Sequence, residues 1–180
     1  RQIYFDSSIN DKKEGAGIRV RTKDQDFAIS KRLFVKASHH SNFEKAAKLD
    51  TYIAYVAAEI KTNLDKTMFQ EACATARDLK MAVPSSKYFL LCEWLDMTPV
   101  STAPTDIEEV LILRGKRINS NIRKDYSSSK KRKQLRSQYI DYLDANPYRT
   151  EVFFRFANHI KSLMSNEGPI EDDALKKGYF

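Results

Sequence analysis

The sequence contains no apolar run close to the roughly 20 residues that a membrane-spanning helix needs. It also lacks the charged-then-apolar segment that is typical of a secretory signal. These absences argue against a membrane or secreted protein, and we expect a cytoplasmic one. The chain begins with Arg1 and not with Met, so we expect a fragment or trimmed chain, in which residues can also be missing internally.

Motifs of several common chemistries are absent as well. Cys73 and Cys92 form no CxxC motif, so we expect two reduced, buried thiols. No further His or Cys lies at zinc-ligand spacing from His39 and His40. The sequence has no GxxxxGK[ST] or GxGxxG loop, and no Ser or Cys nucleophile has a convincing His partner. Zinc, nucleotide-binding and Ser or Cys hydrolase chemistry therefore have no support.

Positive charge is what the sequence does contain, and it is concentrated in one place. The 180 residues carry a formal net charge of +7. Residues 114–136 hold ten Lys or Arg and one acid, Asp125, whereas the rest of the chain holds 21 basic and 23 acidic residues. A local basic excess favours a polyanionic partner, with nucleic acid first. The alternative is a solvated helix face or a flexible loop.

Hydrophobic periodicity predicts an α/β chain that forms one domain over residues 1–180. Short apolar runs predict strands over 31–37, 51–61, 87–94 and 107–113, after a polar strand or loop in 1–25. Helical spacing and capping residues predict four helices. The first follows Ser41 and ends at about 48, and the second follows Asp65 or Thr67 and ends at 80. The third follows Ser129 and ends at 144, and the last runs over 152–164. We expect a core over about 31–113, a basic segment and C-terminal helices over 114–164, and a polar tail over 165–180.

Two ionisable residues lie at the end of the apolar strand predicted over 51–61. Glu59 and Lys61 are two positions apart, so their side chains share one face of the strand. Charged groups seldom occupy such positions unless they are paired or bind a metal. The alternative is that the two residues end an ordinary strand as a solvated pair.

Asp50 is the nearest upstream carboxylate that could join them. In one straight strand it would lie about 30 Å from Glu59, because a strand rises about 3.3 Å per residue. We therefore expect the chain to turn near residues 54–57, which would pair the strand of Asp50 with that of Glu59. No Gly, Asn or Pro marks such a turn.

The pattern Asp50-x8-Glu59-x-Lys61, followed by an amphipathic helix, resembles the motif of the PD-(D/E)XK nucleases. The run EIKTNLDKTMFQEA is also similar to a type II restriction endonuclease family in that group. The resemblance covers roughly residues 34–94. Leu49 stands where many members have a proline before the first aspartate.

The resemblance implies a central mixed sheet flanked by helices and Mg²⁺-dependent cleavage of double-stranded DNA. It makes Asp50 and Glu59 metal ligands with the Ile60 carbonyl as a third, and it makes Lys61 the catalytic lysine. Glu44, as an added acid, and Gln70, beside Glu71 on the following helix, are the candidates for support of the site. Because such an enzyme cuts two strands, the resemblance also implies a homodimer or a heterodimer with a second nuclease subunit.

The basic segment is the candidate DNA contact. Its Lys and Arg residues would neutralise phosphates, while Asn and Arg would reach base edges. The candidate residues are Arg114, Lys116, Arg117, Asn119, Asn121, Arg123, Lys124, Lys130, Lys131, Arg132 and Lys133.

The function expected from these features is that of a type II restriction endonuclease acting in the cytoplasm of a prokaryote, close to the nucleoid. A repair or structure-specific nuclease of the same superfamily is one alternative. A DNA-binding protein without catalysis is another, and so is a domain whose phenylalanine-rich helix over residues 152–163 binds a protein partner.

Overall fold

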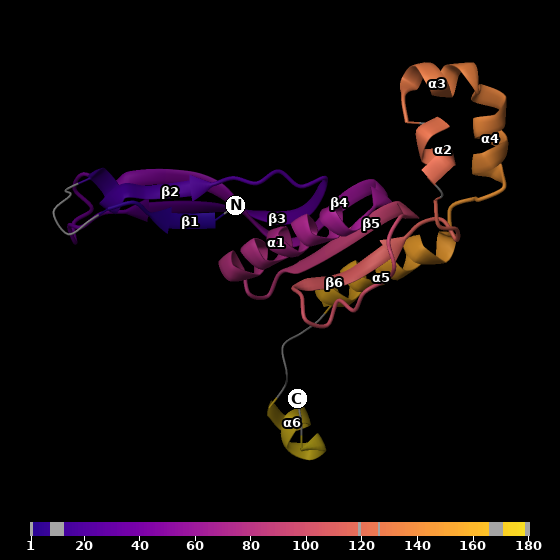
Figure 1. Ribbon diagram of the computed structural model, residues 1–180. Helices are drawn as coiled ribbons and strands as arrows, with labels where there is room; N and C mark the ends of the chain where they lie inside the picture. Colours follow the sequence, from indigo (N-terminus) through magenta and orange to yellow (C-terminus); the bar gives the residue numbers. More distant parts are fainter. Residues whose placement is uncertain (1, 8–12, 119, 126, 166–170, 179–180) are drawn as a thin grey trace. The chain divides into compact units, whose positions relative to one another are not determined.

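A computed structural model describes residues 2–7, 13–118, 120–125, 127–165 and 171–178. The chain divides into two compact units, Arg1–Tyr148 and Arg149–Phe180. The larger unit contains both sheets and the helices α1 to α4 (Figure 1). In the described part of the chain, no helix is both long and apolar enough to cross a membrane.

A mixed four-stranded sheet forms the centre of the larger unit. Its strands lie in the order β3-β4-β5-β6. β3 is antiparallel to β4, whereas β4, β5 and β6 are parallel to one another. The bounds of the strands are Phe27–Ala37 (β3), Ala47–Leu64 (β4), Lys87–Leu95 (β5) and Ile107–Ile112 (β6). The predicted α/β class with a central mixed sheet is confirmed.

Helix α1 (Lys66–Ala82) covers one face of β4, β5 and β6 (Figure 1). Asp65 caps it, as predicted, because its carboxylate accepts a hydrogen bond of 2.9 Å from the Met68 amide. The residues buried between helix and sheet form the hydrophobic core, and burying each large apolar side chain contributes roughly 1.5–3 kcal/mol. The core residues are Ala57, Leu64, Phe69, Ala72, Ala76, Tyr88, Leu90, Cys92 and Ile107. Both cysteines are free thiols, but Cys73 is only half-buried.

Strand β4 does not turn where a turn was predicted. It runs without a break through residues 54–57, and β3 pairs with it from Ala37↔Ala47 to Phe27↔Ala58. The one irregularity is a shift between Ile29 and Ser30, which leaves Tyr55 as an extra residue in β4. The prediction of a turn is therefore wrong: the backbone groups of this apolar stretch bond to β3, and the hairpin closes over residues 38–46 instead.

That hairpin loop also replaces the short helix predicted after Ser41. Phe43 and Lys45 have positive φ angles of 60° and 49°, which no α-helix accommodates. The Ser38 hydroxyl donates to the Glu44 carbonyl at 2.5 Å, and the Asn42 amide donates to the Glu44 carboxylate at 2.7 Å. Local side-chain hydrogen bonds thus stabilise turns here in place of a capping box.

The described residues before β3 include a separate two-stranded sheet of β1 (Gln2–Phe5) and β2 (Ile18–Arg21), and the 3₁₀ turn η1 (Glu14–Gly17) directly precedes β2. Gly15 lies against β4, because a Cβ at this position would come within 2.2 Å of the Ala47 Cβ. A side chain there would force the two segments apart.

The remaining helices follow the sheet in the chain. The basic segment forms α2 (Ser120–Asp125) and α3 (Ser129–Gln134), and α4 (Arg136–Asp144) follows, so the single helix predicted from 130 to 144 is two helices. In the second unit, α5 (Thr150–Ser165) matches the predicted helix over 152–164, and α6 (Glu171–Lys177) lies in the predicted polar tail.

Candidate active site

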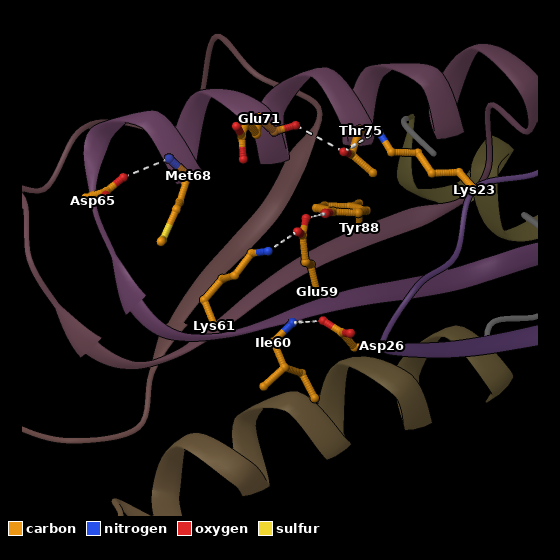
Figure 2. Close-up of polar contacts among 10 residues, drawn as sticks. All are labelled: Lys23, Asp26, Glu59, Ile60, Lys61, Asp65, Met68, Glu71, Thr75 and Tyr88. Carbon is orange, nitrogen blue, oxygen red and sulfur yellow. Dashed lines mark hydrogen bonds and ion pairs between the residues drawn. The ribbon is translucent and has the colours of Figure 1, made fainter. Parts of the chain in front are cut away.

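Glu59 and Lys61 project together from the face of β4 that α1 covers. The register Ala57↔Tyr88, Glu59↔Leu90 and Lys61↔Cys92 places these positions on the core side of the sheet. The Lys61 Nζ lies 2.5 Å from the Glu59 Oε1, and the two side chains are 30% and 22% exposed (Figure 2). The predicted placement of the two side chains on one face of the strand is therefore confirmed, while their catalytic role stays a prediction.

The ion pair keeps Lys61 protonated. The hydrogen bond that Lys61 donates to Glu59 raises the pKa of Lys61, and the negative charges of Glu59, Asp26 and Glu71 raise it further. Partial burial acts in the opposite direction and is the weaker influence overall. At neutral pH Lys61 is thus a fixed cation, suited to stabilising negative charge.

Asp26 is a carboxylate at this site that the sequence analysis missed. Its Oδ2 accepts a hydrogen bond of 2.7 Å from the backbone amide of Ile60, between Glu59 and Lys61 (Figure 2). Asp26 directly precedes β3, and the antiparallel pair Phe27↔Ala58 brings it beside the end of β4. The signal in the sequence was an acid one position before a strand that forms a hairpin with the Glu-x-Lys strand.

Asp50 does not reach this site. It lies nine residues from Glu59 on the same continuous strand, so about 30 Å separates them at about 3.3 Å per residue. Its carboxylate accepts two hydrogen bonds from Arg32, of 3.0 and 2.5 Å. The Arg32 guanidinium also lies 4.7 Å from the centre of the Phe34 ring. The prediction that Asp50 and Glu59 share a metal is therefore contradicted, because both residues belong to one extended strand.

The two residues predicted to support the site, Glu44 and Gln70, lie in different parts of the structure. Glu44 lies in the hairpin loop beyond Ala37 and Ala47, at the opposite end of β4 from Glu59, so its predicted support of the site is contradicted. Gln70 is exposed on α1, and its support of the site stays a prediction. Its neighbour Glu71 acts on the site, since its charge raises the pKa of Lys61.

The residues present fit a magnesium ion. Mg²⁺ prefers oxygen ligands and takes one or two protein carboxylates together with water and phosphate oxygens. Asp26 and Glu59 supply two carboxylates, and the Ile60 carbonyl is in the same stretch of chain. Among the described residues no three His, Cys, Asp or Glu side chains gather into a metal cluster, so a site built wholly from side chains does not fit.

Most of the described cations in the basic segment are exposed, as a DNA contact requires. The exposed ones are Lys116, Arg117, Lys124, Lys130, Lys131, Lys133 and Arg136, while Arg132 is half-buried. Asn119 lies outside the described residues, as do the side chains of Asn121 and Arg123.

Arg114 is buried and does not contact DNA in this conformation. Only 6% of it is exposed, and its Nε donates to the Glu93 carboxylate at 2.8 Å. Its Nη1 donates to the carbonyls of Leu143, at 3.1 Å, and Asn146. Its guanidinium also lies 4.0 Å from the centre of the Tyr148 ring. Arg114 therefore joins the end of β5 to the end of α4, and its predicted role in DNA binding is wrong.

Comparisons with known proteins identify the family. No curated protein matches the chain. A solved structure described as the native BbvCI A2B2 tetramer at low resolution is similar, with 26% sequence identity and a TM-score of 0.49. The match covers 71% of this chain and 46% of that one, so the chain spans less than half the length of this relative. The model of the Bpu10I restriction endonuclease family matches residues 1–180. The chain belongs to the Bpu10I restriction endonuclease family.

Proposed function

We propose that the chain is an Mg²⁺-dependent type II endonuclease of the PD-(D/E)XK superfamily, which hydrolyses double-stranded DNA at a specific sequence. Asp26, Glu59 and Lys61 are its catalytic residues. The observation that carries the proposal is the placement of two carboxylates and a lysine ammonium around residues 59–61 of β4.

A bound Mg²⁺ would lower the pKa of a water ligand and neutralise charge on the phosphate. Asp26 and Glu59 would hold the ion, together with the Ile60 carbonyl. Lys61, which the structure keeps protonated, would stabilise the negative charge that develops on the phosphate oxygens. In this role Lys61 supplies a positive charge beside the phosphate.

A restriction endonuclease that cleaves double-stranded DNA must cut both strands, and one catalytic centre cuts one strand. We therefore propose that the chain acts as a homodimer or with a second nuclease subunit. The exposed lysines of the basic segment would bind phosphates of the DNA backbone.

Digestion of long phage DNA by the complete enzyme, with Mg²⁺ or with EDTA, tests the proposed function. Discrete fragments that appear only with Mg²⁺ are expected. Cutting confined to branched or damaged DNA would indicate a structure-specific repair nuclease instead. Binding to DNA without any metal-dependent cutting would contradict the proposal.

The salt dependence of DNA binding tests the basic segment. Replacing Lys130, Lys131 and Lys133 with alanine is expected to flatten the slope of log K against log salt by up to about 2.7, because each lost phosphate contact removes about 0.9. The matched control replaces three exposed lysines of the second unit, Lys161, Lys176 and Lys177. If both triple variants changed the slope equally, the DNA contact would not lie in the basic segment.

A further inference from the structure

The Glu59 carboxylate is held by two donors, one on each oxygen. Lys61 occupies Oε1, and the Tyr88 hydroxyl donates to Oε2 at 2.6 Å (Figure 2). Lys61 lies on the same strand as Glu59, whereas Tyr88 comes from β5. A single donor would leave the carboxylate free to rotate about its last torsion, which is a broad, roughly two-fold one. The second donor removes that freedom.

Tyr88 is itself fixed on all sides. It is fully buried, and its ring belongs to the core between α1 and the sheet. Burial and the neighbouring Glu59 carboxylate raise its pKa far above the ordinary value, so the hydroxyl keeps its proton and remains a donor. The hydroxyl is also within hydrogen-bonding reach of Thr75 on α1.

Thr75 extends this contact to the segment that carries Asp26. The Thr75 hydroxyl oxygen lies 3.0 Å from the Glu71 carbonyl, one turn earlier in α1, so Glu71 and the Tyr88 oxygen compete for its single proton. The Thr75 hydroxyl accepts a hydrogen bond of 2.6 Å from the Lys23 ammonium (Figure 2). Lys23 precedes Asp26 by three residues in the link between β2 and β3. A chain of polar contacts thus runs from the Asp26 segment through α1 and Tyr88 to Glu59.

We propose that Tyr88 is a positioning residue of the nuclease, and that its hydroxyl, supported by Thr75, sets the orientation in which Glu59 meets the metal. This inference rests on the proposed function of Glu59 as a metal ligand. Groups that orient metal ligands contribute about 10–100-fold to metal affinity or activity in other enzymes. Tyr88 contacts neither DNA nor metal in this role, and it acts only through Glu59.

The test compares two variants. Tyr88→Phe keeps the buried ring and removes only the hydroxyl, and Tyr142→Phe removes a buried hydroxyl from a ring that stacks on Trp94. Mn²⁺ binding to the metal-free complete enzyme is followed by electron paramagnetic resonance, and kcat and KM are measured with Mg²⁺. We expect Tyr88→Phe to weaken Mn²⁺ binding and lower kcat by about 10–100-fold with little change in KM. Tyr142→Phe is expected to match the wild type in all three quantities.

A second pair of variants keeps the proposal testable if Tyr88→Phe fails to fold. Thr75→Ser keeps the hydroxyl and is expected to behave as the wild type, whereas Thr75→Val, which is nearly isosteric, is expected to lose Mn²⁺ affinity and kcat. A folded Tyr88→Phe enzyme with wild-type Mn²⁺ affinity and kcat would overturn the proposal, as would equal behaviour of the two Thr75 variants.

Glu59→Ala, assayed in parallel, separates the two claims. If Glu59→Ala is inactive while Tyr88→Phe is unaffected, the positioning role alone fails. If Glu59→Ala cuts as fast as the wild type, the proposed function fails as well.

Discussion

Replacing Glu59 with glutamine is expected to reduce Mg²⁺-dependent cleavage by about 1,000-fold, or roughly 4 kcal/mol of activation free energy. The substitution keeps the shape of the side chain and leaves an oxygen that can still accept the Tyr88 hydrogen bond. It removes the negative charge that would hold the metal and that Lys61 now faces at 2.5 Å. The cleavage rate under single-turnover conditions, with enzyme in excess over DNA, reports this loss directly.

The neighbouring strands provide a matched control. Lys87 of β5 and Glu108 of β6 form an ion pair of 2.7 Å, with side chains 31% and 29% exposed, close to the exposure of the Glu59–Lys61 pair. Glu108→Gln is expected to cut at the wild-type rate. If Glu59→Gln retained more than about a tenth of the activity, the Glu59–Lys61 pair would be a structural ion pair at the end of a strand.

Replacing Arg114 with alanine is expected to destabilise the protein by about 3–5 kcal/mol, because it leaves partners of a buried charge without their donor. The lost contacts include the Glu93 carboxylate at 2.8 Å and the carbonyls at the end of α4. The stacking of the guanidinium between the Trp94 ring, at 5.1 Å, and the Tyr148 ring is lost as well. Urea unfolding, followed by circular dichroism, measures the change in the free energy of unfolding.

Arg32→Ala serves as the comparison for Arg114→Ala, because Arg32 and Asp50 form an exposed Arg–carboxylate pair. Its effect on the urea midpoint is expected to be far smaller, since exposed pairs contribute little. Arg114→Lys is expected to fall between the wild type and Arg114→Ala, as lysine keeps the charge but loses the planar fork of donors. An Arg114→Ala protein with wild-type stability and weakened DNA binding would instead restore the role in DNA contact.

Local patterns in the sequence predicted the elements that carry the site. The apolar run that ends in Glu59 and Lys61 is the end of β4, and the cap at Asp65 begins α1 where expected. The end of the apolar run and the helix cap can each be recognised from residues close together in the sequence. The Ser41-x-x-Glu44 pattern failed because Asn42 and Ser38 offered the backbone competing hydrogen bonds.

The first carboxylate of the site could not be predicted from spacing alone. Asp50 has the familiar distance along the chain, but Asp26, which is 34 residues before Ile60, has the contact. The register of the β3–β4 hairpin decides between the two, and that register depends on pairing across residues 38–46. Once β4 is known to be continuous, Asp50 is too far from Glu59, whereas an acid at the start of β3 lies beside residues 59–61.

The count of charges in the basic segment had a similar limit. A count treats Arg114 and Lys130 alike. Arg114 directly follows the buried Leu113 and is itself buried, whereas Lys130 is exposed on α3. Composition reports how many cations a segment has, but burial decides which of them can reach a phosphate.

The central claim is that the catalytic centre comprises Asp26, Glu59 and Lys61, and excludes Asp50. One digestion tests it most directly: the same DNA is cut under single-turnover conditions by the wild type, Asp26→Asn and Asp50→Asn. We expect Asp26→Asn to be slowed about 100-fold, the scale of losing a charge-stabilising group, and Asp50→Asn to cut at the wild-type rate. Loss of cleavage in Asp50→Asn with full activity in Asp26→Asn would contradict this assignment.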